Sequence, residues 1–326
     1  MNRFRVACRA GLVIVVCTAA SCAPTLQQTR VQHRQKSPPP MLQLWTDPGD
    51  LSRRDLLWGP GRAVTAPTTN MPYTVVKRDD SGYSRGYDVV GPDKRKWSIK
   101  VGPEAQSEVV LSRILWALGY HQPETYYVTG WQLVGNWKYE GDPARFRLQS
   151  DHNSDGEWKW VDNPFAGTAP MQGLIAINLL LANWDLKTSN NRIYKIGERS
   201  EPSRRYVVQD LGASLGKPRV FPIPVGTRNN IDDFESTTLI KDVEGAMVQL
   251  NYRGRHGEIL ERLSIADVIW ACALMNRLRD AQLDAAFRAG GYAPDIRQRY
   301  IRKIRAKIQE GLALRPLVAA RAGDQA

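Results

Sequence analysis

Apolar and polar residues alternate in short stretches after residue 70, which predicts β-strands separated by tight turns. The stretches are Tyr73–Lys77, Arg85–Val90 and Lys96–Val101, with clusters of Asp, Ser, Gly and Pro between them. Residues Pro103–Gly119 carry apolar side chains at helical spacing and end on glycine, which predicts a helix. Strand patterns return at Glu124–Val128 and Gly130–Val134. The order β-β-β-α-β-β predicts one compact, β-rich lobe.

The rest of the chain has mainly helical patterns. The expected helices are Met171–Ala182, Ser264–Arg279, Ala281–Ala289 and Pro294–Gly311, the first of them almost wholly apolar. Two short strands are expected at Arg192–Lys195 and Arg205–Gln209, and a polar, hairpin-like stretch at Asn136–Phe165. We therefore expect an α+β protein with two lobes. A small β-rich lobe with one helix covers residues 71–135, a larger and mainly helical lobe covers 136–315, and 316–326 form a tail.

The N-terminal segment has the pattern of an export signal. A short basic start is followed by the apolar run Ala10–Ala20, which is too short to span a bilayer of about 30 Å. Small residues then precede Cys22, so residues 1–21 resemble a bacterial lipoprotein signal peptide, after which the Cys22 thiol is acylated. An ordinary signal peptide with a chance cysteine is the alternative. Residues 22–70, rich in Pro, Gln, Thr and Arg, are expected to form a tether, of which the stretches Leu42–Trp45 and Leu56–Trp58 could dock on the body. The expected location is the bacterial cell envelope, with a lipid anchor in the membrane and the domain facing the periplasm or the exterior.

The composition fits a soluble globular body and narrows the classes of partner. Of the 326 residues, 42% are hydrophobic and 24% are charged, which excludes a mostly disordered chain and a polytopic membrane protein. The formal net charge is +12, but the basic residues are scattered and not gathered in one stripe, which does not favour nucleic-acid binding. With the signal removed and Cys22 acylated, only Cys272 remains as a free thiol, so no intramolecular disulfide is expected.

Two short stretches carry the chemistry of the chain. Asp185 is followed five residues later by Asn190, and Asp210-Leu211-Gly212 comes after the strand that ends near Gln209. This spacing resembles the catalytic and metal loops of the protein-kinase-like superfamily, in its atypical branch of HipA-like and spore-coat CotH-like kinases. The resemblance in the order of elements covers residues 71–315. The resemblance in amino-acid identity is limited to the short stretches that are named here.

The resemblance implies phosphoryl transfer from ATP, or another nucleotide, to a hydroxyl acceptor of unknown identity. It places Asp185 beside the acceptor hydroxyl, to orient it and take its proton. It makes Asn190 and Asp210 the oxygen ligands of a Mg²⁺ or Mn²⁺ ion that bridges the phosphates. Lys187 would neutralise charge that develops on the transferred group.

The small lobe offers the matching nucleotide-binding residues. Lys100 lies in a strand where kinase-like folds keep the lysine that contacts the α- and β-phosphates, and Glu108 in the next helix could hold it in place. Gly82 and Gly86 lie between the first two strands, where their backbone could approach the phosphates. Each of these residues alone has an ordinary structural explanation, as a solvated charge or a turn residue. Their common order is what favours a nucleotide site.

The chain departs from ordinary protein kinases at several positions, and two other functions remain open. Asn183-Trp184 stands where ordinary kinases have His-Arg, Leu211 replaces a phenylalanine, and no Ala-Pro-Glu signature follows. These departures leave the base and metal positions intact. The alternatives are a catalytically silent kinase-like binding module, and an enzyme that transfers a nucleotidyl group in the same cleft.

Two further segments have features of a site. Residues 151–162 match much of a calcium-binding loop, but Asp162 replaces the usual glutamate and the flanks have strand patterns, so a polar turn explains them as well. In the segment 227–235, Arg228 could meet a phosphate, and Asp232 or Asp233 an acceptor, although a helix cap explains the acids equally well.

Overall fold

The computed structural model describes residues 40–79, 83–134, 139–140, 143–149, 154–196, 203–219, 225–254 and 262–317. Cys22 and the expected signal peptide, residues 1–21, lie outside these residues. All the described residues belong to one compact unit, Pro38–Ala326. Within the described part of the chain, no helix combines the length and the apolar character needed to cross a membrane.

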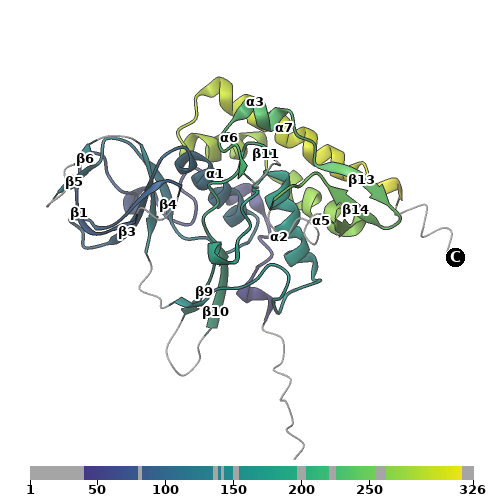
Figure 1. Ribbon diagram of the computed structural model, residues 1–326, viewed down its shortest axis with the longest axis horizontal. Coiled ribbons are helices and arrows are strands. Elements are labelled where there is room, and N and C mark those ends of the chain that lie inside the picture. Colours follow the sequence, from purple (N-terminus) through teal and green to yellow (C-terminus); the bar gives the residue numbers. More distant parts are fainter. Residues whose placement is uncertain are drawn as a thin grey trace, which may run out of the picture. The chain divides into compact units, whose positions relative to one another are not determined.

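The first lobe is built on a seven-stranded sheet (Figure 1). Its strands are β1 (Pro72–Asp79), β2 (Arg85–Val90), β3 (Lys96–Val101), β4 (Thr125–Val128), β5 (Gln132–Val134), β6 (Tyr139–Glu140) and β7 (Ala144–Leu148), in the order β4-β7-β3-β2-β1-β5-β6. All neighbouring strands are antiparallel except β1 and β5, which are parallel. Aromatic residues fill one face of this sheet: Trp97, Trp131 and Phe146 are almost fully buried, and Phe146 contacts both tryptophans edge to face.

One helix, α1 (Glu104–Ala117), joins the first lobe to the second. Most of its residues are buried all round, including the polar Glu104, Ser107, Glu108 and Arg113. A helix buried on every side contacts other elements on all its faces, and α1 packs on β3, β4 and β7 and also on α6 of the second lobe. The polar side chains at its start therefore lie where the two lobes meet.

The second lobe is mainly helical, with short strands at its edges (Figure 1). Its helices are α2 (Ala169–Leu180), α3 (Ile231–Glu235), α5 (Ile265–Asn276), α6 (Asp280–Ala289) and α7 (Pro294–Leu312). Its strands are β8 (Ser154–Gly156), β9 (Asn191–Ile196), β10 (Ser203–Val208), β11 (Pro218–Arg219), β12 (Val225–Gly226), β13 (Ile240–Glu244), β14 (Met247–Leu250) and β15 (Arg262–Ser264). The apolar helix α2 packs against α5 in the centre of this lobe, as its sequence predicts.

The structure confirms the α+β class and the arrangement in two lobes, in which a β-rich lobe with one helix precedes a larger, mainly helical lobe. Two details differ from the expectation. The boundary at residues 135 and 136 is too early, because β7 lies between β3 and β4 in the first sheet and its Phe146 is buried there. The three-stranded sheet β13-β14-β15 lies in a region where only helices were expected.

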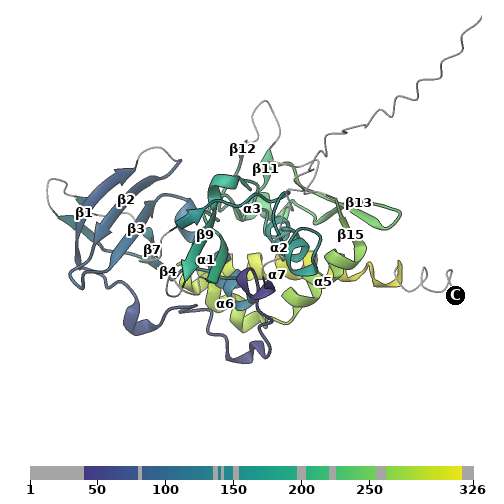
Figure 2. The same ribbon diagram turned by 90° about the horizontal axis from the view of Figure 1, so that it is seen from below.

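Within the expected tether of residues 22–70, the segment from residue 40 onward is packed over a longer stretch than the Leu42–Trp45 and Leu56–Trp58 contacts that the sequence indicated. Leu44, Leu51 and Leu56 are buried in the main core, and the short 3₁₀ turns Met41–Gln43, Leu51–Arg53 and Ala63–Thr65 order the backbone between them. Gln282 of α6 donates its side-chain amide to the carbonyl of Leu51 over 2.7 Å. This segment, purple in Figure 2, is therefore packed on the body of the protein. The apolar residues in it explain why, since leaving them in water is unfavourable.

Candidate active site

Strand β3 presents Lys100 on the face of the sheet opposite to the aromatic core. Trp97, Ile99 and Val101 are buried on the core side, so the alternate residue Lys100 points the other way. In the sheet register, Lys100 lies between Gly86 of β2 and Arg145 of β7. The three residues therefore form one row across the sheet, on the side that faces α1 and the second lobe.

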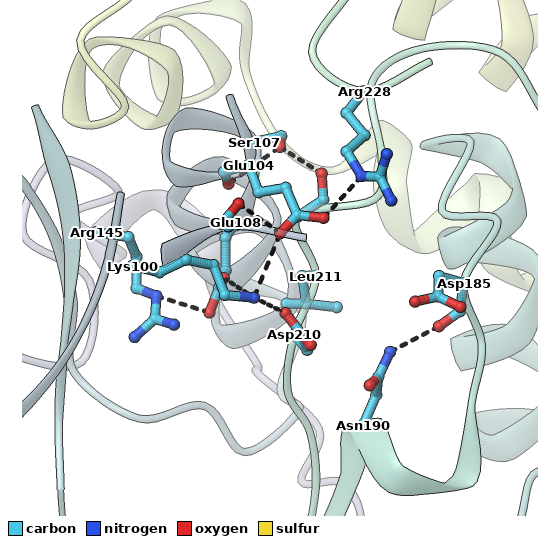
Figure 3. Close-up of polar contacts among 12 residues, drawn as sticks. Lys100, Glu104, Ser107, Glu108, Arg145, Asp185, Asn190, Asp210, Leu211 and Arg228 are labelled. Atoms are coloured by element: carbon cyan, nitrogen blue, oxygen red, sulfur yellow. Dashed lines mark hydrogen bonds and ion pairs between the residues drawn. The ribbon is translucent and has the colours of Figure 1, made fainter. Parts of the chain in front are cut away.

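The ammonium group of Lys100 is surrounded by three carboxylates (Figure 3). Its Nζ lies 3.5 Å from Oε2 of Glu104 and 3.6 Å from Oε2 of Glu108, and it contacts Oδ1 of Asp210 directly. Burial acts to lower the pKa of Lys100, but the charges of Glu108 and Asp210 outweigh it and raise the pKa. Lys100 is therefore a permanent cation at neutral pH, as a phosphate-binding lysine must be.

Glu108 is fixed by two arginines that sequence analysis did not single out. Nε of Arg145 lies 3.0 Å from Oε1 of Glu108, and Nη1 of Arg147 donates to the same oxygen over 3.3 Å. The side chain of Arg145 is buried, and burial lowers its pKa. Both arginines come from β7, where alternate positions bring them to the face of Lys100. The sequence does not indicate the pairing of Arg145 with Glu108, because β7 carries no recognisable motif.

Asp210 follows β10 in a strained backbone conformation. Its φ angle is +55°, in the left-handed region that Asp enters more readily than most residues. Leu211 is buried behind it, and Gly212 lies against α1 so closely that an added Cβ would be 2.4 Å from Cβ of Glu104. Burial acts to raise the pKa of Asp210, but Lys100, Arg147 and Arg145 lower it to about 2. Asp210 is therefore ionised, and packing of the next two residues fixes its position.

Asp185 lies in the loop after α2, which buried amide groups hold in place. Asn183 donates Nδ2 to Oδ1 of Asn178 over 2.9 Å, and the backbone amide of Trp184 donates to the carbonyl of Ala213 over 3.1 Å. The second bond ties the Asp185 loop to the Asp210 loop. The Asp185 carboxylate accepts a contact of 2.7 Å from Nζ of Lys187, whose side chain is 39% exposed. The structure thus pairs Lys187 with Asp185.

Asn190 and Asp210 together fit a divalent metal ion. Asn190 donates Nδ2 to the carbonyl of Asp185 over 2.7 Å, so its Oδ1 is the end left for a ligand (Figure 3). Both side chains line one cavity of about 260 Å³, and Asp210 is ionised there. Among the described residues no group of three or more His, Cys, Asp or Glu could hold a metal. Two hard oxygen donors without a full protein cage are what Mg²⁺ needs when phosphates and water complete its shell.

The same cavity reaches the strands of the first lobe. Lys100, Gly86, Arg145 and Arg147 line it together with Asn190 and Asp210. Gly86 is close to the β1 strand, since an added Cβ would lie 3.1 Å from the carbonyl of Asp79. Gly82 lies outside the described residues. A second cavity of about 740 Å³ adjoins the first and shares five lining residues with it: Asp79, Asp88, Ser98, Arg147 and Gln209.

Glu104 and Arg228 form a second link between the lobes. Of these two residues, the sequence indicated Arg228 but not Glu104. Nε of Arg228 donates to Oε1 of Glu104 over 2.7 Å, and Ser84 donates to its Oε2 over 2.9 Å. The Arg228 guanidinium also stacks on Tyr83 at 3.8 Å and on Trp184 at 4.7 Å. Glu104 resembles the acidic residues common in any first helical turn, so nothing in the sequence distinguishes it. Of the two acids proposed for an acceptor, Asp232 pairs with Arg299, and the backbone amide of Asp233 is capped by Asn230.

The calcium-loop pattern at residues 151–162 is used differently in its described part. Asp155 pairs with Lys195 at 2.8 Å and with Arg204 at 2.6 Å, and Asp162 lies 3.6 Å from Lys159. Residues 151–153 lie outside the described part of the chain. Lysine and arginine side chains thus neutralise both carboxylates. A polar turn around β8 explains this arrangement.

Comparison with family models finds no match to this chain, and comparison with curated proteins finds none either. Among solved structures, the chain is similar to a Helicobacter pylori proinflammatory kinase, CtkA, with a TM-score of 0.46 and 11% sequence identity. The similarity covers 76% of this chain and 95% of that chain.

Proposed function

We propose that this chain is a kinase-like phosphotransferase that moves a phosphoryl group from a nucleotide to a hydroxyl acceptor. The observation that carries the proposal is the position of Lys100, which lies among Glu104, Glu108 and Asp210 at the wall of a cavity that also contains Asn190. A cation for phosphates, an acid that fixes it and two metal-type oxygens are the parts that phosphoryl transfer requires.

The residues of the chain have separate tasks in this proposal. Lys100 binds the phosphates of the nucleotide, and Glu108, held by Arg145 and Arg147, orients it. Asn190 and Asp210 would hold a Mg²⁺ or Mn²⁺ ion, which neutralises phosphate charge when bound. The adjoining larger cavity offers room for the base beside Ser98 and Gln209.

Asp185 acts on the acceptor. Its carboxylate receives the proton of the acceptor hydroxyl while the hydroxyl oxygen bonds to the terminal phosphorus. The bond between that phosphorus and its bridging oxygen breaks, and the nucleoside diphosphate leaves with the electron pair. Lys187 contacts Asp185 at 2.7 Å, which orients the carboxylate and puts a positive charge next to the transferred group.

We also propose that the protein is exported and anchored by a lipid on Cys22, because the basic start, the apolar run and the small residues before Cys22 form a lipoprotein-type signal. The acceptor would then be an envelope component or another molecule outside the cytoplasm.

One contact favours a second candidate, a catalytically silent module that binds a ligand. Lys100 and Asp210 contact each other directly, so each neutralises the charge that the other would offer to phosphate or metal. Calorimetry with ATP and Mg²⁺ tests the nucleotide site, and Lys100→Ala should weaken the binding. Labelling with α- and γ-labelled ATP then separates the functions: γ-label on the acceptor indicates phosphoryl transfer, α-label indicates nucleotidyl transfer, and neither indicates the silent module.

A further inference from the structure

The cavity of about 740 Å³ extends beyond the part that it shares with the phosphate end of the cleft. Its far end is lined by three elements: the packed N-terminal segment through Arg54 and Pro60, the α1–β4 connection through His121, and β10 through Arg205. Trp116 and Tyr120 add aromatic surface, and Ile196 adds apolar surface. This end therefore combines apolar walls with cationic side chains from separate parts of the chain.

The two arginines at this end have no carboxylate partner within the described parts of the chain. The guanidinium of Arg54 stacks on the ring of Trp116 at 4.8 Å, which holds it in place and leaves its N–H edges available. Arg205 lies near His121: burial lowers the pKa of His121, and the charge of Arg205 lowers it further. By contrast, Arg147, at the shared end, is paired with Glu108. Unpaired guanidinium groups at a cavity wall are ready-made partners for phosphate or carboxylate.

We propose that this end of the cavity is a binding site for a small organic anion, with a phosphate or carboxylate on Arg54 and Arg205 and an aromatic or apolar body against Trp116 and Tyr120. The site does not depend on the proposed phosphoryl transfer. It gives the packed N-terminal segment a role, because Arg54 reaches the cavity only while residues 44–56 are docked on the core.

Phenyl phosphate is a suitable probe, because it joins one ring to one phosphate. The chain provides matched controls, since Arg53 and Arg204 precede the two proposed residues in sequence but do not line the cavity. In calorimetry with the full chain, Arg54→Gln and Arg205→Gln should each weaken phenyl phosphate binding tenfold or more. Arg53→Gln, Arg204→Gln and Lys100→Ala should change it less than threefold, and inorganic phosphate should bind more weakly than phenyl phosphate.

Several results would overturn the site. The first is that the folded wild type does not bind phenyl phosphate at millimolar concentration. The second is that Lys100→Ala loses phenyl phosphate binding while Arg54→Gln retains it. The third is that inorganic phosphate binds as tightly as phenyl phosphate. ATP binding provides a separate readout: Arg54→Gln should leave the affinity for ATP unchanged. A parallel loss of ATP affinity would show that the nucleotide itself occupies this end, and would contradict a separate anion site while supporting a nucleotide cleft.

Discussion

Arg228 Nε lies 2.7 Å from Oε1 of Glu104, and this ion pair joins the segment after the Asp210 loop to the first turn of α1. Glu104 is in turn 3.5 Å from Lys100, so the pair connects that segment with the proposed phosphate-binding lysine. Both side chains are largely shielded from water, at 12% and 8% exposure. Such a pair is costly to break on one side only.

A double-mutant cycle tests this coupling. Glu104→Gln and Arg228→Gln should each destabilise the fold, and the double variant should lose less than the sum of the two, with a coupling of about 1–3 kcal/mol in urea unfolding. The exposed pair Arg262–Glu244 serves as the control, since its side chains are 50% and 60% exposed and a surface pair contributes about 0–1 kcal/mol. Equal coupling in the two cycles would contradict the role given to the Glu104–Arg228 link.

The nucleotide and metal residues should separate in binding experiments. Lys100→Ala should weaken ATP binding about tenfold to a hundredfold, because it removes a charge-assisted contact to phosphate. Asp210→Asn removes the only full negative charge of the proposed metal pair and should abolish the Mg²⁺-dependent part of the affinity. Asp162→Asn is the matched control, since Asp162 is exposed and does not line the cavity. Unchanged Mg²⁺ dependence in Asp210→Asn would remove Asp210 from the metal site.

Lys307 should make the stability of the fold depend on pH. It is buried in α7, donates to the carbonyl of Leu180 over 3.0 Å and lies 4.2 Å from the ring of Phe234. Burial, followed by the charge of Lys303, lowers its pKa from 10.5 to about 7. Between these two values the unfolded state binds more protons than the folded state, so stability should rise with pH from about 7 towards 10.

Lys307→Met keeps most of the volume and removes the buried amine. It should raise the melting temperature at pH 7 by a few degrees and reduce the rise of stability between pH 7 and 10. Lys241→Met, at an exposed position, should change neither quantity. A lower melting temperature in Lys307→Met with the same pH slope as the wild type would show that the amine is stabilising where it lies.

The anchor has its own test. Cys22→Ser should leave the protein without lipid and shift it from the membrane fraction to the soluble fraction, because acylation needs the thiol. Cys17→Ser, within the proposed signal, is the matched control and should fractionate as the wild type does. Membrane fractionation of Cys22→Ser at the wild-type level would contradict the lipoprotein hypothesis.

Much of the fold could be predicted because its elements are local in sequence. The strand Arg85–Val90 and the strand Lys96–Val101 have the predicted bounds, since alternation and flanking turns define them without help from the rest of the chain. The place of β7 could not be predicted, because a strand that inserts between two earlier strands leaves no local signal. The apolar stretches Leu42–Trp45 and Leu56–Trp58 indicated docking of Leu44 and Leu56, whereas the docking of Leu51 was hidden by a polar, proline-rich surrounding that is typical of linkers.

The candidate site was predictable where chemistry imposes spacing. The sequence indicated Asp185, Asn190 and Asp210 through their fixed spacing within two loops. It indicated Lys100 through its position in a strand. Arg145 and Glu104 were not predictable, because their role comes from burial beside Lys100 and Glu108, and burial depends on tertiary packing. The contact of Arg228 with Glu104 was not predictable either, because it joins residues 124 positions apart in the sequence.

Transfer of labelled γ-phosphate from ATP tests the central proposal most directly, with Asp185→Asn as the decisive variant. The wild type, incubated with ATP and Mg²⁺ or Mn²⁺, should label itself or a component of an envelope extract. Asp185→Asn keeps the size and most hydrogen bonds of the residue but cannot take the acceptor proton, so labelling should fall about a hundredfold while ATP affinity changes little. Equal labelling by the wild type and Asp185→Asn, or no labelling by a wild type that binds ATP, would contradict the proposed phosphotransferase mechanism.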